Sequence, residues 1–168
     1  FQAINRGQVR LSGFEIKGSL AFGKHTELHL GYGQTRGTDI ETDQPLNSVN
    51  PAKLVLGVDQ KLGAWTVGAL LTHVARKSEK HIDFSANANQ FATPSYTTLD
   101  LRSTWQLRPG LKLSAALRNL TDRTYWEWTN VRGIAANSPV LDSYTAPGRN
   151  LAVALVAVAV VILSAGLK

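Results

Sequence analysis

The sequence contains no cysteine, so neither a disulfide framework nor a thiolate metal site is available to it. Basic residues form no dense run either. The net charge of +6 is spread along the whole chain, and this argues against a nucleic-acid-binding patch. The chain starts at Phe1, and no early segment combines a basic stretch, an apolar core and a small-residue cleavage site. We therefore expect that a signal was removed or that the sequence starts within a longer protein.

Helical spacing is also scarce, and apolar residues instead recur at every second position. Phe14, Ile16 and Leu20, for example, are separated by polar residues. The pattern predicts strands at 14–22, 27–32, 53–59, 65–72, 98–105, 111–118 and from 151 onward. Each is close to the ~10 residues that a tilted membrane strand needs. Because such strands have one polar and one apolar face, the mean hydropathy of −0.10 is compatible with a membrane barrel.

The connections between these strands alternate in length. Short turns are expected at 23–25, 61–63 and 108–110, and long loops at 35–50, 76–95 and 129–146. Outer-membrane barrels have this asymmetry, whereas a soluble sandwich has less reason to sort its loops. We therefore predict an all-β fold: an antiparallel meander of about seven strands, forming an incomplete segment of a transmembrane β-barrel, with the three long loops on one rim.

Aromatic residues gather near both sets of connections. Phe22, Trp65 and Trp105 lie next to short turns, and Tyr96, Trp126 and Trp128 lie next to long loops. Tyr and Trp are favoured where one end of the ring is apolar and the other wet, so two aromatic girdles are expected at the membrane surfaces. Gly31, Gly33, Gly57 and Gly68 are interpreted as strand glycines that relieve crowding or admit a plug.

The most informative segment runs from Arg118 through an Asn119-Leu120-Thr121-Asp122 corner into Tyr125-Trp126-Glu127-Trp128, and is completed by Val131-Arg132-Gly133 and by 144–149. On its pattern alone it is also compatible with a soluble β-hairpin that has a buried aromatic cluster. It resembles the last hairpin of TonB-dependent outer-membrane receptors, and the YWxW…VRG core is similar to that of the haem/haemoglobin branch. The resemblance covers about residues 6–155.

This resemblance implies the C-terminal portion of a plugged barrel of roughly 22 strands in the Gram-negative outer membrane. Haem is then a transported ligand, with no firmly bound cofactor. The implied partners are outer-membrane lipid, haem or a haem-carrier protein, the absent N-terminal plug and remaining strands, and the TonB complex acting through the absent region. No catalytic or metal-binding role is expected. A siderophore receptor of the same family, or a small structural or adhesive outer-membrane barrel, stays open as an alternative.

Candidate ligand-binding residues follow from position. His25 and His29 lie on the short-turn side and His73 is expected in the outer girdle, so His81 is the histidine placed to meet external haem. Tyr125, Trp126 and Trp128 are predicted to hold the last loop at the membrane surface without coordinating iron. Arg132 is expected to pair with Asp142 or Glu127.

Two further features need an interpretation: the apolar C-terminal run and an acidic cluster in the first long loop. Residues 151–163 form an uninterrupted apolar run of thirteen, below the ~18 expected for a spanning helix. We divide the chain into residues 1–155, the barrel portion, and 156–168, an atypical apolar extension. Asp39, Glu41 and Asp43 are interpreted as a solvated acidic loop rather than a calcium site.

Overall fold

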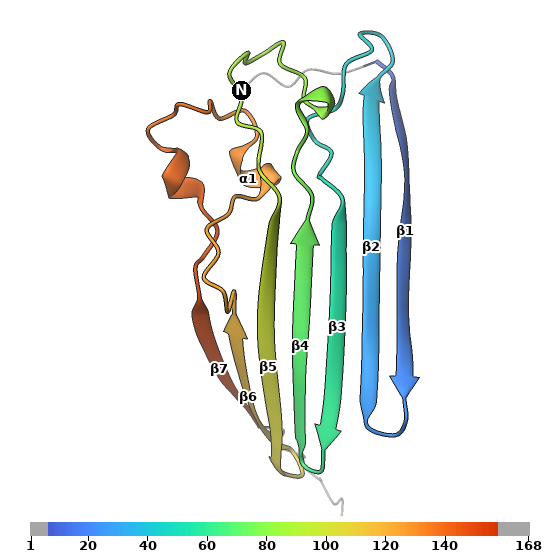
Figure 1. Ribbon diagram of the computed structural model, residues 1–168, viewed down its shortest axis with the longest axis vertical. Helices are drawn as coiled ribbons and strands as arrows, with labels where there is room; N and C mark the ends of the chain where they lie inside the picture. Colours follow the sequence, from blue (N-terminus) through green and yellow to red (C-terminus); the bar gives the residue numbers. More distant parts are fainter. Residues whose placement is uncertain (1–6, 158–168) are drawn as a thin grey trace, which may run out of the picture.

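The computed structural model describes residues 7–157 and consists of one antiparallel sheet with loops at one end (Figure 1). Its strands follow one another in chain order, each paired with its sequence neighbours. They are β1 (Val9–Phe22), β2 (Thr26–Asp39), β3 (Lys53–Leu62), β4 (Trp65–Val74), β5 (Tyr96–Arg108), β6 (Leu111–Arg118) and β7 (Asn150–Ala157). The predicted seven-stranded meander is therefore confirmed, and the described sheet is open between β1 and β7.

All long connections lie on one rim and all short turns on the other, as predicted (Figure 1). The first loop (40–52), the second loop (75–95) and the third loop (119–149) form the loop rim. Short helices interrupt the second and third loops: η1 (Glu79–His81), α1 (Trp128–Val131) and η2 (Leu141–Tyr144). In the short turns Gly23, Gly63 and Gly110 have φ values of 70°, 62° and 77°, a left-handed conformation that glycine adopts without steric cost.

The boundaries of β1 and β2 differ clearly from the sequence prediction. β1 begins at Val9 instead of Phe14, and β2 continues to Asp39, so the first loop starts five residues later than expected. The two strands pair along their full length, from Val9 opposite Asp39 to Phe22 opposite Thr26. Backbone pairing needs no apolar side chain. In the added part of β1 the parity of the alternation also changes, because Val9 and Leu11 occupy odd positions whereas Phe14 and Ile16 occupy even ones.

The register separates the sheet into two faces of opposite character. On one face Leu28 lies between Leu20 and Val58, and Leu101 lies between Ala69 and Leu117. The large side chains of this apolar face are exposed, with Phe22 at 72% and Leu151 at 68%. The opposite, polar face carries the charged and small residues of the same strands, such as Glu15, His29, Asp59 and Arg102. An exposed apolar face of this extent fits contact with lipid hydrocarbon.

Rings mark both ends of the apolar face. Trp65 and Trp105 stack beside the short turns with centroids 4.9 Å apart, so this predicted girdle pair is confirmed. Phe14 and Tyr32 meet nearer the loop rim at 5.5 Å. His73 has the same face parity and lies within hydrogen-bond distance of Thr97, 2.8 Å from Nδ1 to Oγ1, consistent with the girdle position expected for it.

β7 contains the start of the apolar run. Asn150–Ala157 pairs with β6 over its whole length and places Leu151, Val153 and Leu155 on the apolar face. The strand crosses the division proposed between residues 155 and 156 by two residues. The remainder of the expected extension, 158–168, lies outside the described residues.

Candidate functional site

The Asn-Leu-Thr-Asp corner fastens the two ends of the third loop together. Asn119 is buried, and its Nδ2 donates to the Arg123 and Pro147 carbonyls at 2.9 and 3.3 Å, while its Oδ1 accepts from Arg123 N at 2.9 Å. Asp122 Oδ1 accepts from Arg149 N at 2.7 Å. These bonds join the exit of β6 to the entry of β7. We call Asn119, Asp122 and their partners the clasp.

Backbone conformation explains the residue types in the clasp. Asn119 and Asp122 have φ values of 48° and 53°, which Asn and Asp tolerate better than other non-glycine residues. At Gly148 an added Cβ would lie 2.8 Å from Asp122 Oδ1, so a side chain there would displace the carboxylate. The backbone N–H of Asn119 also donates to Asp100 Oδ1 at 2.8 Å, which ties the clasp to β5.

Trp128 joins the third loop to the other two. Its side chain is 3% exposed, and its Nε1 donates to the Asn47 carbonyl of the first loop at 2.8 Å. The Lys77 ammonium of the second loop lies 4.7 Å from the ring centroid, within cation–π range. One indole therefore contacts all three loops, and we call Trp128, Lys77 and Asn47 the hub.

Lys77 is buried inside this hub. Its Nζ donates to the Val49 carbonyl at 2.7 Å, and its backbone N–H donates to the Thr93 carbonyl at 2.9 Å. Burial, followed by the nearby Arg132 guanidinium, lowers the pKa of Lys77 to about 8. The ammonium therefore acts as an internal cross-link between the first and second loops.

The first and second loops are also paired through amide groups. Asn47 Nδ2 donates to the Asp83 carbonyl and Asn47 Oδ1 accepts from Asp83 N, both at 2.8 Å. Asp83 is buried, so removal of the Asn47 side chain would break two hydrogen bonds in a place where water has little access.

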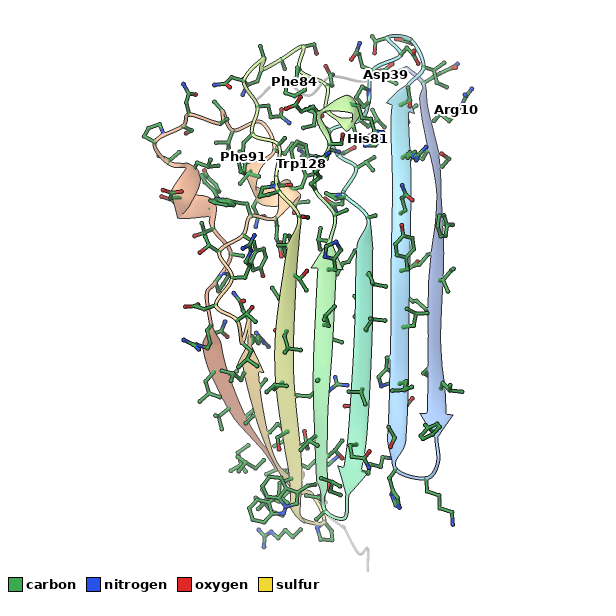
Figure 2. All side chains as sticks on the ribbon, in the orientation of Figure 1. Arg10, Asp39, His81, Phe84, Phe91 and Trp128 are labelled. Carbon is green, nitrogen blue, oxygen red and sulfur yellow. The ribbon has the colours of Figure 1, made fainter. Side chains whose placement is uncertain are left out.

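The second and third loops pair like two short strands. Phe91 N donates to the Ile134 carbonyl at 2.8 Å, and Ala136 N donates to the Asn89 carbonyl at 2.7 Å. Beside these bonds the Phe91 and Trp126 rings meet edge to face with centroids 5.4 Å apart. Figure 2 shows Phe91 and Trp128 within the loops, above the ends of the strands. Together with the hub, this pairing turns three long loops into one loop cluster.

The three aromatic residues predicted to lie at the membrane surface, Tyr125, Trp126 and Trp128, have different surroundings in the structure. Tyr125 stacks on Tyr96 at 4.1 Å, at the end of β5, and Trp126 Nε1 donates to the Leu141 carbonyl at 3.1 Å. Both are partly exposed. For Trp128 the predicted position at the membrane surface is wrong, since the ring is enclosed by the loops. The indole N–H groups of both tryptophans donate to loop carbonyls.

The phenol of Tyr125 is protonated at neutral pH. Burial, with smaller contributions from Glu127 and Asp100, raises its pKa above the ordinary value.

Arg132 does not hold the loop in the expected way. Among residues 7–157 it makes no ion pair with Asp142 or Glu127, and its side chain is exposed. The reason is that α1 ends at Val131, which is fully buried, and this orients the following residue toward solvent.

His81 lies apart from the other four predicted residues. It ends η1 and lines a hollow of about 420 Å³ between the end of β2 and the first and second loops, which none of the other four lines. Partial burial and then the nearby Lys80, Lys77 and Arg36 lower the pKa of His81 below its ordinary value. The imidazole is therefore neutral at neutral pH and keeps a free lone pair.

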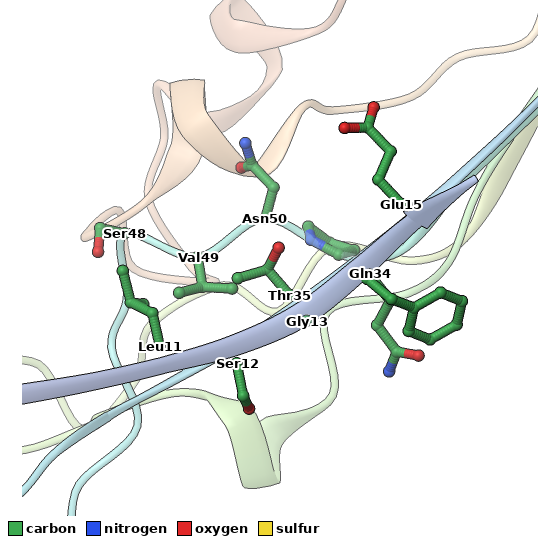
Figure 3. Close-up of a pocket in the computed structure, with 12 residues that line it drawn as sticks. Leu11, Ser12, Gly13, Glu15, Gln34, Thr35, Ser48, Val49 and Asn50 are labelled. Carbon is green, nitrogen blue, oxygen red and sulfur yellow. The ribbon is translucent and has the colours of Figure 1, made fainter. Parts of the chain in front are cut away.

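The first loop shapes a second hollow on the polar face of β1 and β2 (Figure 3). Its volume is about 740 Å³, and Val49 and Asn50 of the loop lie on the same side of the strands as Leu11 and Thr35. The Cβ of a residue replacing Gly37 would lie 2.8 Å from both Leu11 Cδ2 and Val49 Cγ2. Gly37 thus permits the loop to fold back over the polar face.

Sequence reasoning missed a charged cluster on the polar face of the wall. His29 Nε2 lies 3.0 Å from Asp59 Oδ2, and Arg102 donates from Nε to Asp59 Oδ1 at 3.0 Å and also contacts Oδ2. A Cβ on Gly68, between Asp59 and Arg102, would lie 2.8 Å from Arg102 Nε. The interpretation of Gly68 as a glycine that relieves crowding is confirmed. Side chains alternate between the two faces of a strand, and comparing this alternation across neighbouring strands would have placed these residues together on the polar face.

The residues of the hub carried no such signal. Lys77 and Asn47 are polar residues in long polar loops, and nothing nearby in sequence marks them as buried.

No helix among the described residues has the length and hydropathy needed to cross a membrane. Within 7–157, no three His, Asp or Glu side chains converge as a metal site would require. Asp39 instead caps a turn, accepting from Glu41 N at 3.0 Å.

Comparison with known proteins identifies the family. The family model described as TonB dependent receptor-like, beta-barrel matches residues 1–120. Heme/hemopexin utilization protein C of Haemophilus influenzae (strain 86-028NP) is 34% identical over 130 residues, covering 74% of this chain and 18% of that protein. Hemoglobin-binding protein A of Haemophilus influenzae is 31% identical over 175 aligned positions, covering 89% of this chain and 17% of that protein.

A lactoferrin-binding protein A of Neisseria meningitidis serogroup A (strain Z2491) is 32% identical and covers 92% of this chain and 18% of that protein. Among solved structures, the copper transporter OprC superposes with a TM-score of 0.74 at 20% identity, covering 85% of this chain and 23% of the other. The ferripyoverdine receptor of Pseudomonas aeruginosa gives 0.58 at 16%, with 85% and 19% covered. The chain spans about 18% of the length of the first curated relative. It belongs to the TonB-dependent receptor family of the Gram-negative outer membrane and forms seven neighbouring strands of its barrel wall.

Proposed function

We propose that this chain is part of an outer-membrane receptor that takes up haem from a haem-carrier protein and is energised by the TonB complex. The chain supplies barrel wall and three loops, while a plug and further strands complete the receptor. Haem is cargo here rather than a resident cofactor, and the chain has no catalytic role.

The observation that supports this proposal most is the coverage of the loop cluster by relatives named for haem carriers. The match to hemoglobin-binding protein A extends over 89% of this chain, so it includes much of the loop-bearing sequence. A carrier protein presents a broad surface, and a cluster held by backbone pairing and a buried indole offers a pre-organised surface in return.

Within the cluster we assign two kinds of role. Tyr125, Trp126 and Arg132 are accessible and supply carrier contacts, whereas Trp128 positions the loops from inside. His81 is the neutral imidazole available to haem iron at the loop rim.

A siderophore receptor is the second candidate. It is favoured by the likeness of the wall to a receptor solved with bound ferripyoverdine, although that likeness is at 16% identity and concerns the fold. A small structural or adhesive barrel would use the same wall without transport.

Growth of an iron-starved host expressing the whole receptor separates these functions. Growth on haemoglobin or another haem carrier that also requires the TonB complex would support the proposal. Growth on a ferric siderophore alone would favour the second candidate, and growth on neither would favour a structural barrel.

A double substitution tests the role of the aromatic cluster. Trp126→Ala with Trp128→Ala in the whole receptor is expected to weaken carrier binding and to leave the absorption spectrum of loaded haem unchanged. Trp65→Ala with Trp105→Ala, on the short-turn rim, is the matched control. Normal carrier affinity with a shifted Soret band would mean that the cluster belongs to the haem site itself.

A further inference from the structure

A shallow groove crosses the apolar face of the wall near the short turns. Its volume is about 470 Å³, and it extends from β3 to β7. The floor consists of Val67, Ser103 and Ala115, which face one another on three neighbouring strands. Larger side chains line the bank toward the loop rim, and these are Val58, Leu101, Leu117 and Leu151. We call this hollow the transverse groove.

The ring pair beside the short turns borders the transverse groove on its other side. Trp65 precedes Val67 by two residues on β4. Trp105 follows Ser103 by two residues on β5, so both rings share the face of the floor. Two residues of a strand span about 6.6 Å, and tryptophan girdles lie at the level of the lipid head groups. The floor therefore lies just inside the hydrocarbon layer, on the short-turn side of the membrane.

The lining of the groove selects an apolar occupant. Of the described residues that line it, only Arg102 is charged, and its guanidinium is bonded to Asp59 on the polar face. The Gln60 amide is also satisfied, because it accepts from Thr26 Oγ1 at 2.6 Å and donates to the Lys61 carbonyl at 3.3 Å. An occupant must therefore be apolar over most of its length.

Ser103 is the polar exception on the floor. It has the same face parity as Leu101 and Trp105, and it is partly buried. Within residues 7–157 its hydroxyl makes no hydrogen bond, whereas the neighbouring Thr104, on the opposite face, lies 3.2 Å from Ser114 Oγ. A hydroxyl that faces hydrocarbon without a partner is unfavourable, so an occupant that carries an acceptor would stabilise it.

We propose that the transverse groove binds one phospholipid of the short-turn leaflet, with an acyl chain on the floor and an ester carbonyl accepting from Ser103 Oγ. The ester groups of a phospholipid lie between its head group and its hydrocarbon, which is the depth of Ser103. Barrel strands are tilted by about 35–45° from the membrane normal, so a groove that crosses them is tilted as well, and a chain that enters at the head-group level can follow it. The floor and the hydroxyl distinguish this site from the general contact of the apolar face with lipid.

The test uses the whole receptor, purified in detergent and depleted of lipid, with a diacyl phosphatidylethanolamine as the probe and native mass spectrometry as the measurement. Ala69→Leu with Ala115→Leu fills the groove and keeps the face apolar. It is expected to weaken phospholipid binding by about tenfold, because several methylene groups lose their contacts. The matched control, Gly18→Leu with Ala157→Leu, adds the same side chains to the same face outside the groove. It should change binding by less than about twofold.

An ether-linked phosphatidylethanolamine, which has the same chains and head group but no carbonyl, tests the hydrogen bond. The unmodified receptor should bind the ether lipid about threefold more weakly than the ester lipid. Ser103→Ala should abolish this difference and leave binding of the ether lipid unchanged. A preference for the ester lipid that persists in Ser103→Ala would overturn the proposal.

Folding is judged by heat-modifiable migration, and the Ser103→Ala comparison decides the proposal if the groove-filled variant fails to fold. Equal phospholipid affinity of the unmodified and groove-filled receptors would overturn the proposal. Equal weakening by the matched control would also overturn it, since that result would indicate general contact with the apolar face. So would weaker self-association of the groove-filled receptor with unchanged lipid binding, which would assign the groove to a second copy. Because lipid binding is measured without haem or a carrier protein, failure of the haem-receptor proposal would leave this result unaffected.

Discussion

In the strand wall Leu20 and Leu151 expose 63% and 68% of their surface, whereas in the loop cluster Val131 and Trp128 expose 0% and 3%. Within the described residues the buried hydrophobic side chains, Ile82, Trp128 and Val131, all lie in the loops. The two regions obey the same physical rule in different solvents. Lipid hydrocarbon accepts the outer side chains of the wall, but water surrounds the loops, so they bury an apolar core of their own.

The difference also determines how each region is held together. The wall depends on backbone ladders along its full length, while the loop cluster depends on a few long-range contacts at the hub, the clasp and the Phe91 pairing. Single substitutions in the loop cluster should therefore destabilise the loops strongly but locally. In the wall, the loss of stability should depend on which face of the sheet carries the substituted residue.

The largest effect is expected at Trp128. Trp128→Ala removes a buried ring that contacts all three loops and should destabilise the cluster by about 3–5 kcal/mol. Hydrogen exchange of the whole receptor should then show faster exchange throughout the second and third loops, with the strands unaffected. Trp65→Ala is the control, since this ring is 44% exposed. Loops that remain protected in Trp128→Ala would mean that strand ladders alone hold them.

A charged residue tests which face of the wall meets lipid. Leu101→Lys, on the apolar face near the middle of β5, should destabilise the folded barrel by about 2–4 kcal/mol. Thr104→Lys, with the opposite parity on the same strand, should have little effect. Urea unfolding of the receptor in lipid vesicles measures both. Equal effects of the two substitutions would contradict the assignment of faces.

The clasp should be the next most sensitive position. Asn119→Ala leaves the Arg123 backbone N–H and two carbonyl groups without their side-chain partner, at a cost of about 2 kcal/mol. Limited proteolysis should cut the third loop near its ends. Asn137→Ala, at an exposed position in the middle of the loop, removes one surface hydrogen bond and serves as the control. Resistance of Asn119→Ala to protease would show that the clasp is dispensable.

A smaller, pH-dependent effect is expected from Lys77. Its folded pKa of about 8 lies below the ordinary lysine value of 10.5, so between these values the unfolded loops bind more protons. Stability of the cluster should therefore rise with pH across this window, by an amount on the order of 1 kcal/mol. Tryptophan fluorescence during urea titration at pH 7.5 and pH 10 measures the change. Lys77→Met should abolish the pH dependence, and a fall in stability over this window in the unmodified receptor would refute the assignment.

Much of the wall could be predicted because the membrane imposes a repeating pattern on the sequence. Leu28, Leu30 and Tyr32 alternate with polar neighbours, and this placed β2 on the sheet with the correct face outward. The end of β2 at Asp39 could not be predicted, because both faces of residues 34–39 are polar and only the pairing with β1 keeps them extended. The position of Trp65 and Trp105 beside the short turns could be predicted from the sequence, whereas their stacking depends on the register of β4 and β5.

The sequence by itself determined the strand alternation, the sorting of loop lengths and the turn at Asn119 and Asp122, because each depends on neighbouring residues: parity, turn chemistry and residues that tolerate positive φ. The clasp bonds to Pro147 and Arg149 depend on the tertiary structure, since their partners are 28 and 27 residues apart in sequence. Only the tertiary structure decided that Trp128 is enclosed rather than at the membrane surface, since its hydrogen-bond acceptor, Asn47, lies 81 residues away. The burial of Lys77 and the exposure of Arg132 were decided in the same way. A side chain in a long loop is buried or exposed according to which other loops fold against it, and local sequence does not encode that choice.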